Sequence, residues 1–214
     1  MTRYRTETGE YVPVTVLEAK PCVVVECKTK ATHGYDAIQV AWEPLKRDSL
    51  QSKAVVGVTK KRGLAAARVM REFRCQDASQ FAPGQQLTVA VFTKGDTVQV
   101  QGTTKGRGFQ GVIKRCGKHG GPGAHGSHFH RTTGSIGMRT WPARVLKNTG
   151  MPGQMGNVTA TIRNLEVIDI DPTANVLLVK GGVPGGRNGM LRITNRALSF
   201  EAKVLESIKG AASA

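Results

Sequence analysis

The stretch Gly102-Thr103-Thr104-Lys105-Gly106-Arg107-Gly108-Phe109-Gln110-Gly111-Val112 lies in the part of the sequence that most strongly constrains the fold. Around it, residues 97–165 form a run of 69 with ten Lys and Arg, four of the five His, 14 of the 26 Gly and no Asp or Glu. A folded surface normally mixes both charge signs, so the exclusion of carboxylates indicates a densely negative partner, beside which a carboxylate would be desolvated and repelled. We therefore predict an RNA-binding arm; the alternative is a solvated basic loop or a disordered tail.

Sequence on both sides of this run is typical of short β-strands separated by Gly, Pro, Asp or Asn. We predict strands at residues 12–17, 22–26, 37–42, 87–92 and 97–101, and again at 158–163, 165–170 and 175–180, with residues 171–174 as the last turn. Many short strands favour a mainly β fold, a small barrel with the long basic loop inserted between its strands. The expected organisation is a first part of the barrel at 1–101, the arm at 102–157, and the remaining strands with a helical tail at 158–214.

One or two short helices complete the predicted fold. Residues 62–73 are rich in good helix formers, although their apolar periodicity is weak. Near the C-terminus, Ser199 can cap a helix whose apolar side chains share one face.

Composition agrees with a polyanionic partner. The 214 residues include 31 Lys and Arg against 15 Asp and Glu, a net charge of +16 and a pI near 10.2, which is typical of nucleic-acid-binding proteins. Aromatic residues make up only 5%, so we expect an aliphatic, valine-rich core. No run of 18 apolar residues and no signal-peptide pattern occurs, so we expect a cytoplasmic protein with no membrane partner. The four cysteines fit no disulfide framework, and we expect them reduced, with Cys22 and Cys27 as small core residues.

Two motifs in the arm have alternative interpretations. Residues 106–111 match G-x-G-x-x-G, but a dinucleotide site needs a following helix and an acidic residue about 20 positions on. Residues 112–117 have no helical pattern and the next acid is Glu166, so we expect flexible backbone that approaches phosphates. The cluster of Cys116 with the four histidines of the arm could hold zinc, but its spacing is loose, and we expect imidazoles that contact RNA and no metal or other cofactor.

Several strings resemble the bacterial form of the large-subunit ribosomal protein three family. The sequences that carry the resemblance are residues 102–112, His125-Gly126-Ser127, Gly134-Ser135-Ile136-Gly137, Met151-Pro152-Gly153-Gln154-Met155-Gly156-Asn157 and Leu177-Leu178-Val179-Lys180-Gly181-Gly182-Val183-Pro184-Gly185, together with residues 12–17 and 21–22 near the start. The resemblance places Met1-Thr2 at a Met-Thr pair that follows a first strand in the family. The chain departs from the family at residues 147–150, where Lys-Asn-Thr-Gly stands in place of Lys-Gly-Lys-Lys.

The resemblance implies a translation-factor-like β-barrel whose inserted loop reaches the peptidyl-transferase region. It also implies binding to large-subunit ribosomal RNA early in assembly, and contact with neighbouring large-subunit proteins, the fourteenth and the nineteenth. The loop tip would comprise Gly150, Met151, Gly153, Gln154, Met155 and Gly156, with an N5-methylglutamine at Gln154.

We expect an architectural protein without catalytic residues, since paired carboxylates are excluded from the arm and no hydrolase or nucleotide-binding motif occurs. An obligate homo-oligomer is not expected. The residues predicted to bind RNA are Lys105, Arg107, Lys114, Arg115, Lys118, His125, His128, His130, Arg131, Arg139, Trp141, Arg144 and Lys147. The alternatives are a zinc-dependent RNA-modifying enzyme, which metal analysis would identify, and a free-standing RNA chaperone, which would not co-sediment with large subunits.

Overall fold

Strands make up most of the regular structure, as predicted. The computed structural model describes residues 1–75 and 77–195. Its strands are β1 (Thr2–Arg5), β2 (Tyr11–Glu18), β3 (Cys22–Lys28), β4 (Ala37–Pro44), β5 (Ala67–Arg74), β6 (Gln86–Leu87), β7 (Thr97–Thr103), β8 (Gly108–Gln110), β9 (Gly153–Met155), β10 (Thr159–Asp171), β11 (Val176–Lys180) and β12 (Leu191–Asn195). The helices are α1 (Lys30–His33), α2 (Lys53–Lys61) and α3 (Val112–Cys116), with single 3₁₀ turns η1 (Asp48–Leu50), η2 (Ala78–Gln80) and η3 (Val89–Val91).

Six strands form the larger sheet, in the order β1-β2-β11-β10-β7-β12. β2 pairs antiparallel with β11, with Leu17 opposite Leu177 and Thr15 opposite Val179. Along β7 the side chains alternate between half-buried and buried, with Val98 and Val100 fully buried, as expected where one face of a strand covers a core. This sheet is open, with β1 and β12 as its edges, so the mainly β prediction is confirmed but a closed barrel is not seen among the described strands.

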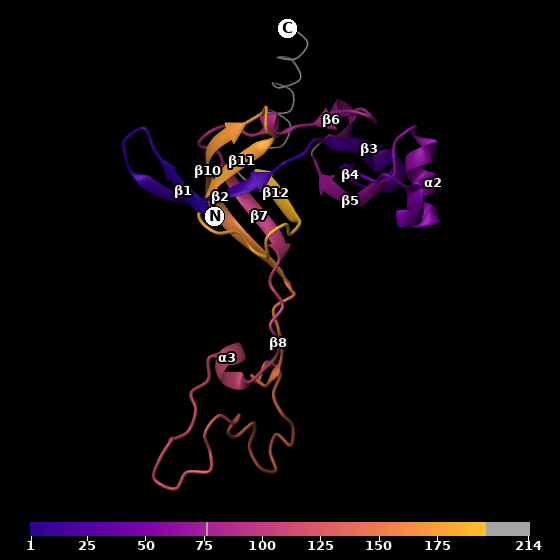
Figure 1. Cartoon of the computed structure of the whole chain (residues 1–214). Helices are drawn as coiled ribbons and strands as arrows, with labels where there is room; N and C mark the ends of the chain where they lie inside the picture. The colour runs from indigo at the N-terminus through magenta and orange to yellow at the C-terminus, as the bar shows by residue number, and fades with distance from the viewer. Residues whose placement is uncertain (76, 196–214) are drawn as a thin grey trace. The chain divides into compact units, whose positions relative to one another are not determined.

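Four strands form the second sheet, in the order β5-β4-β3-β6. Helix α2 lies beside this sheet (Figure 1). The buried residues of the protein are mostly aliphatic, as predicted from the composition. Among the described residues, Phe81 is the only aromatic side chain that is buried. Cys22, Cys27 and Cys75 pack against the cluster of Ile38, Val40 and Phe81, in agreement with the expectation for the first two.

The helix predicted at residues 62–73 is wrong. Helix α2 ends at Lys61, and Gly63 follows with a φ of +68°, a conformation that suits glycine and ends helices. The chain then forms β5, which pairs along its whole length with β4, from Pro44 opposite Ala67 to Ala37 opposite Arg74. Pairing with a neighbouring strand overrides the helix preference of the Ala, Arg, Met and Glu residues in this segment.

Other boundaries also differ from the prediction. The strand expected at 87–92 is only β6 followed by turn η3, because β6 pairs with just Cys22 and Val23 at the start of β3. The two strands expected at 158–163 and 165–170 are one strand, β10, which continues through Asn164 despite its φ of +59°. Residues 112–117, expected to lack a helix, contain the short helix α3, which ends at Gly117 with a φ of +67°. The helix predicted to begin near Ser199 lies outside the described residues.

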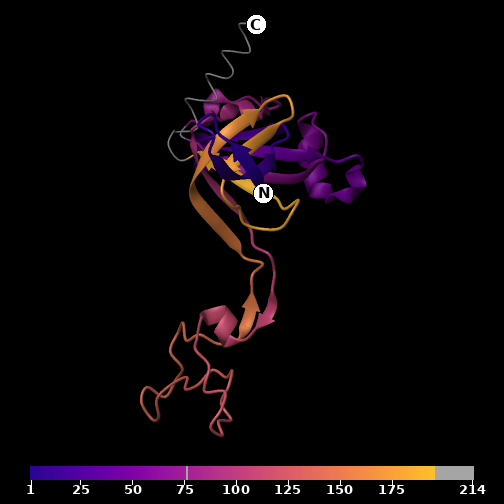
Figure 2. The ribbon, with the colours of Figure 1, turned by 60° about the vertical axis from the view of Figure 1, so that its left-hand side comes forward.

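The chain divides into two compact units. Of the described residues, unit 1 comprises 1–75, 77–100, 162–183 and 192–195, and unit 2 comprises 101–161 and 184–191. No helix among the described residues is long and apolar enough to cross a membrane. Within unit 2, two chain segments run side by side toward helix α3, and beyond them the chain forms an irregular loop (Figures 1 and 2).

Candidate RNA interface

Unit 2 carries positive charge without any compensating acid. It contains ten Lys and Arg and no Asp or Glu, so it contributes +10 to the net charge of +16. The eight ion pairs of the described residues all lie in unit 1. The cations of unit 2 therefore have no carboxylate of this unit to neutralise them, which leaves their charge available to an external anion.

Backbone contacts hold the two chain segments of unit 2 together. Thr104 donates its N–H to the Val158 carbonyl at 2.9 Å, and Arg107 donates its N–H to the Met155 carbonyl at 2.8 Å. Between them, Gly156 has a φ of +73° and lies so close to the Lys105 carbonyl oxygen that a Cβ would overlap it. These contacts use main-chain atoms, so the side chains of Lys105 and Arg107 remain exposed.

Helix α3 lies against the antiparallel pair formed by β8 and β9. In that pair Phe109 stands opposite Gln154. From the last turn of α3, Arg115 donates through Nη1 to the Met151 carbonyl at 2.6 Å and through Nε to the Gln154 carbonyl at 3.2 Å. A Cβ on Gly153 would lie 3.3 Å from Cζ of this guanidinium, so glycine lets the strand pass close beneath it. Arg115 was predicted to bind RNA, and the structure places its guanidinium on two backbone carbonyls.

The segment predicted as the loop tip is held from α3 through its main chain. Cys116 donates through Sγ to the Met151 carbonyl at 3.7 Å, and a Cβ on Gly150 would lie 3.0 Å from that sulfur. Gln154 itself is exposed, and its side-chain amide donates only a long bond of 3.4 Å to the Met155 carbonyl. The arrangement fixes the backbone of residues 150–155 while presenting the Gln154 side chain outward.

A second backbone closure shapes the loop that carries the histidines. Gly121 donates its N–H to the His130 carbonyl at 2.8 Å, and His130 Nδ1 lies 2.9 Å from the Pro122 carbonyl oxygen. Because a carbonyl only accepts, this contact requires the proton on Nδ1 and leaves Nε2 as the free nitrogen of a neutral ring. His125 and His128 are exposed, and their rings make no hydrogen bond or ion pair with the described residues.

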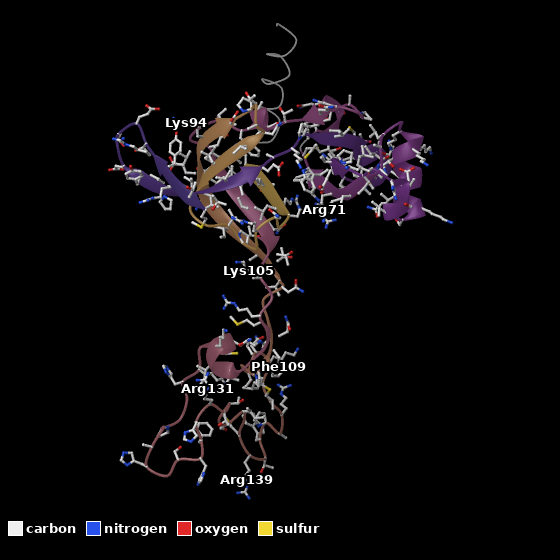
Figure 3. The ribbon with its side chains drawn as sticks, in the orientation of Figure 1. Arg71, Lys94, Lys105, Phe109, Arg131 and Arg139 are labelled. Atoms are coloured by element: carbon white, nitrogen blue, oxygen red, sulfur yellow. The ribbon has the colours of Figure 1, made fainter. Side chains whose placement is uncertain are left out.

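The remaining predicted residues lie along the surface of unit 2. Lys105, Arg131 and Arg139 stand at separate levels of the unit (Figure 3). Trp141 is 82% exposed, although the indole is large and apolar. The other predicted cations are also exposed, except for the half-buried Lys118; they are Lys114, Arg144 and Lys147. No single pocket gathers these side chains, so they form an extended surface, the kind of arrangement that suits contact with a nucleic-acid backbone.

Sequence reasoning missed two exposed side chains of this surface. Phe109 is 75% exposed opposite Gln154 and offers a flat ring for stacking. Arg187 belongs to unit 2 although it follows the arm by thirty residues. The close packing of Gly185 on the Thr103 carbonyl, where a Cβ would lie at 2.8 Å, brings its segment to the base of the arm. The glycine-rich string at residues 181–186 was the available signal.

The side chains that could bind a metal ion are dispersed over residues 1–75 and 77–195. No group of three or more His, Cys, Asp or Glu side chains in this part of the chain is arranged to hold a metal ion. Unit 2 has no carboxylate to orient a histidine as a general base. The arrangement can neutralise phosphates, donate hydrogen bonds and stack on bases.

Comparison with known proteins identifies the family. Residues 51–176, more than half of the chain, match the family described as "Ribosomal protein L3". The chain is 50% identical over 185 residues to the "Large ribosomal subunit protein uL3" of Thermotoga petrophila and to that of Thermotoga maritima, covering 86% of this chain and 88% of each relative. It is 47% identical over 192 residues to the protein of the same name from Geobacter metallireducens, covering 89% of this chain and 90% of the relative. The chain therefore belongs to the ribosomal protein L3 family.

Proposed function

We propose that this member of the ribosomal protein L3 family is a structural constituent of the large ribosomal subunit that binds large-subunit ribosomal RNA directly. It acts in the cytoplasm, within the subunit, and performs no chemistry of its own. The observation that carries the proposal is the charge of unit 2, ten cations with no acid, in a chain whose relatives are named as large-subunit proteins.

In this proposal the exposed cations of unit 2 neutralise crowded phosphates, except for Arg115, whose guanidinium is held by two backbone carbonyls. The backbone contacts of the unit keep the arm narrow. Lysine and arginine side chains on an acid-free surface release counterions when they meet phosphate, which supplies most of the binding free energy. The exposed rings of Trp141 and Phe109 stack on unpaired bases or sugars, and His125 and His128 donate hydrogen bonds to RNA. The imidazole of His130 closes its own loop through Nδ1 and offers only Nε2.

The family resemblance adds finer assignments that we also propose. The larger sheet corresponds to a translation-factor-like barrel, which serves as a mount for the arm. The segment with Gln154 shapes the peptidyl-transferase region indirectly, and the protein joins early in assembly beside the fourteenth and nineteenth proteins of the subunit. Exposure of the Gln154 side chain is compatible with its N5-methylation before assembly.

The test is the salt dependence of RNA binding by the full chain. A variant with Ala at four exposed cations of unit 2 should flatten the slope of log affinity against log salt by roughly three, at about 0.7–0.9 per phosphate neutralised; the positions are Lys105, Arg107, Lys114 and Arg139. A control variant removes the same charge from unit 1 at lysines that are already paired with acids: Lys20, Lys30, Lys94 and Lys180.

The control should change the slope by less than about one, because its lysines are engaged by carboxylates rather than by phosphate. Tagged protein from a lysate should also co-sediment with large subunits, and the four-cation variant should do so less. Equal slopes for the four-cation variant and the wild-type chain would rule out unit 2 as the phosphate-binding surface.

A further inference from the structure

A second group of unpaired cations lies in unit 1, around helix α2. Residues 44–71 contain eight Lys and Arg and a single acid, Asp48. Three of these cations are held by carboxylates: Lys60 by Asp48 at 2.7 Å, Arg62 by Glu26, and Arg68 by Glu43 at 2.9 Å. The others include Lys46, Arg47, Lys53 and Lys61, all exposed and without an ion-pair partner among the described residues. We call these four residues the α2 surface.

The clustering is a property of this region, not of unit 1 as a whole. Elsewhere in the described part of unit 1, lysines and arginines generally have partners. Lys20, Lys28, Lys30, Lys94 and Lys180 are paired with acids, and Arg3, Arg74 and Arg192 lie over aromatic rings. The α2 surface therefore differs from the rest of unit 1: it has four cations without an ion-pair partner within 16 residues, whereas most other lysines and arginines of the unit contact an acid or an aromatic ring.

Local contacts hold these cations in a fixed arrangement. Leu45 donates its N–H to the Ala66 carbonyl at 2.7 Å, and the Gln51 side-chain amide donates to the Ala67 and Arg68 carbonyls at 3.0 and 3.1 Å. The ion pair between Asp48 and Lys60 then joins turn η1 to the end of α2. Lys46 and Arg47 are thereby held close to the C-terminal end of α2, where Lys61 lies, so the positive charges of these three residues add there. Lys53 extends the positive charge to the first residue of the same helix.

From this arrangement we propose that the α2 surface is a second phosphate-binding site, specific for the backbone of double-stranded RNA. Residues 44–71 contain no aromatic residue, so the surface offers no stacking platform for an unpaired base. Three of its four cations are lysines, which act on phosphates as point charges rather than as bidentate readers of base edges. On α2, Lys53 and Lys61 are separated by roughly 12 Å of helix rise, a distance that spans several phosphates of a duplex.

An acidic protein partner fits this surface less well. Protein interfaces bury an apolar centre surrounded by a polar rim, whereas here the exposed apolar residues are the scattered side chains Leu50 and Val58. Single exposed apolar side chains are ordinary on any surface. The inference rests on the proposed function only in taking RNA as the polyanion, and it concerns a unit that carries none of the arm's residues.

The test compares three variants of the full chain in binding to a short, blunt-ended RNA duplex across a range of salt concentrations. The first removes the α2 surface with Lys46→Ala, Arg47→Ala, Lys53→Ala and Lys61→Ala. The second is the paired-lysine control described above, which removes the same charge from the same unit. The third, called the arm variant, is the four-cation variant of unit 2 with Ala at Lys105, Arg107, Lys114 and Arg139. All changes in the first two are at exposed side chains, so thermal unfolding should be nearly unaffected.

The slope of log affinity against log salt concentration is negative. We expect the α2 variant to make it less steep by roughly three, and the control to change it by less than about one. Raising the salt concentration from about 50 to 200 mM is a fourfold change, and a slope difference of about three converts it into four to the third power. The affinity of the wild-type chain should therefore fall about 60-fold more than that of the α2 variant. Equal effects of the α2 variant and the control, or no effect of either, would overturn the inference. The inference would also be overturned if the α2 variant bound the RNA duplex normally but was incorporated less into large subunits. That result would indicate that the α2 surface binds a protein partner.

The arm variant separates this inference from the proposed function. A lower slope for the arm variant with an unchanged slope for the α2 variant leaves the proposed function standing and removes the second site. The reverse pattern retains the α2 site and contradicts the role of unit 2.

Discussion

Replacing Arg115 by Ala should loosen the segment of residues 151–155 without removing a phosphate contact. Arg115 makes two directed hydrogen bonds to the carbonyls of Met151 and Gln154. The neighbouring Lys114 lies on the same helix and is exposed, and its amino group makes no hydrogen bond or ion pair with the described residues. The two residues carry the same charge and are neighbours on α3, but we predict different roles: Arg115 holds the backbone of residues 151–155, and Lys114 contacts phosphate.

The magnitude follows from the two bonds. A hydrogen bond contributes about 0.5–1.5 kcal/mol net, and because Arg115 is exposed we take each of its bonds near the middle of that range. Their loss should cost about 2 kcal/mol in the stability of the α3–β9 contact, which changes its opening equilibrium by a factor of about 30. Amide exchange in the β8–β9 pair, and at the Arg107 N–H that donates to Met155, should accelerate by up to that factor.

Hydrogen exchange of the free protein, followed by peptide for residues 104–117 and 150–160, measures this directly. Arg115→Lys is the informative companion, because it keeps the charge but cannot make the two bonds of the planar guanidinium. It should exchange like Arg115→Ala, whereas Lys114→Ala should exchange like the wild-type chain. For RNA binding we expect the opposite effects of the two substitutions. Lys114→Ala should make the slope of log affinity against log salt less steep by roughly one, whereas Arg115→Ala should leave that slope unchanged. Exchange rates in Arg115→Ala that match those in Lys114→Ala would refute the assignment.

Two further predictions concern single carboxylates. Gln154→Glu should slow large-subunit assembly more than Gln154→Ala, because it introduces a carboxylate among phosphates; equal rates, measured by pulse labelling of subunits, would contradict this. Glu72 accepts hydrogen bonds from Lys28 and from the Tyr35 hydroxyl, and these bonds lower its pKa from the ordinary 4.5. The stabilisation is therefore present above the ordinary value and lost as the pH falls through the lowered pKa. Glu72→Gln should reduce the melting temperature at neutral pH, with the difference from the wild-type chain shrinking in acid, and an unchanged difference at low pH would exclude the ion pair as its cause.

The sequence predicted the strands where period-two burial and pairing agreed. At β7 and β11, buried and half-buried residues alternate along the strand. β2 and β4 are rich in Val, Ile, Leu and Ala, and each has an antiparallel partner. Prediction failed where the local residue preference opposed the strand, or where the strand was too short to show a pattern. Strand β5 is rich in helix-forming residues and forms because β4 provides an edge, while β1, β8 and β9 are too short to show a period. Closure of the larger sheet could not be inferred, because strand count alone does not determine whether edges meet.

For the candidate site, charge was predictable and geometry was not. Exclusion of acids from residues 97–165 is visible in the sequence, and it led to every exposed cation of unit 2 before Arg187. Which cation contacts backbone and which faces outward depends on the turn of α3, a five-residue helix that no periodicity indicates. Arg115 and Lys114 are indistinguishable by composition, and only the placement of Met151 and Gln154 beside the helix separates them.

The absence of acids also explains how unit 2 is held together. A unit without carboxylates cannot use ion pairs to order its long side chains, so the backbone carbonyls are its main negative partners. Arg115 bonds to the carbonyls of Met151 and Gln154, and His130 to that of Pro122. Such contacts require the backbone to be within reach of a side chain or of another backbone, and glycine removes the Cβ that would prevent it, as at Gly153 and Gly156. The glycines and the missing acids are thus linked. Because unit 2 has no carboxylates to pair with its cations, hydrogen bonds to backbone carbonyls stabilise it, and the glycines allow the close approach that these bonds require.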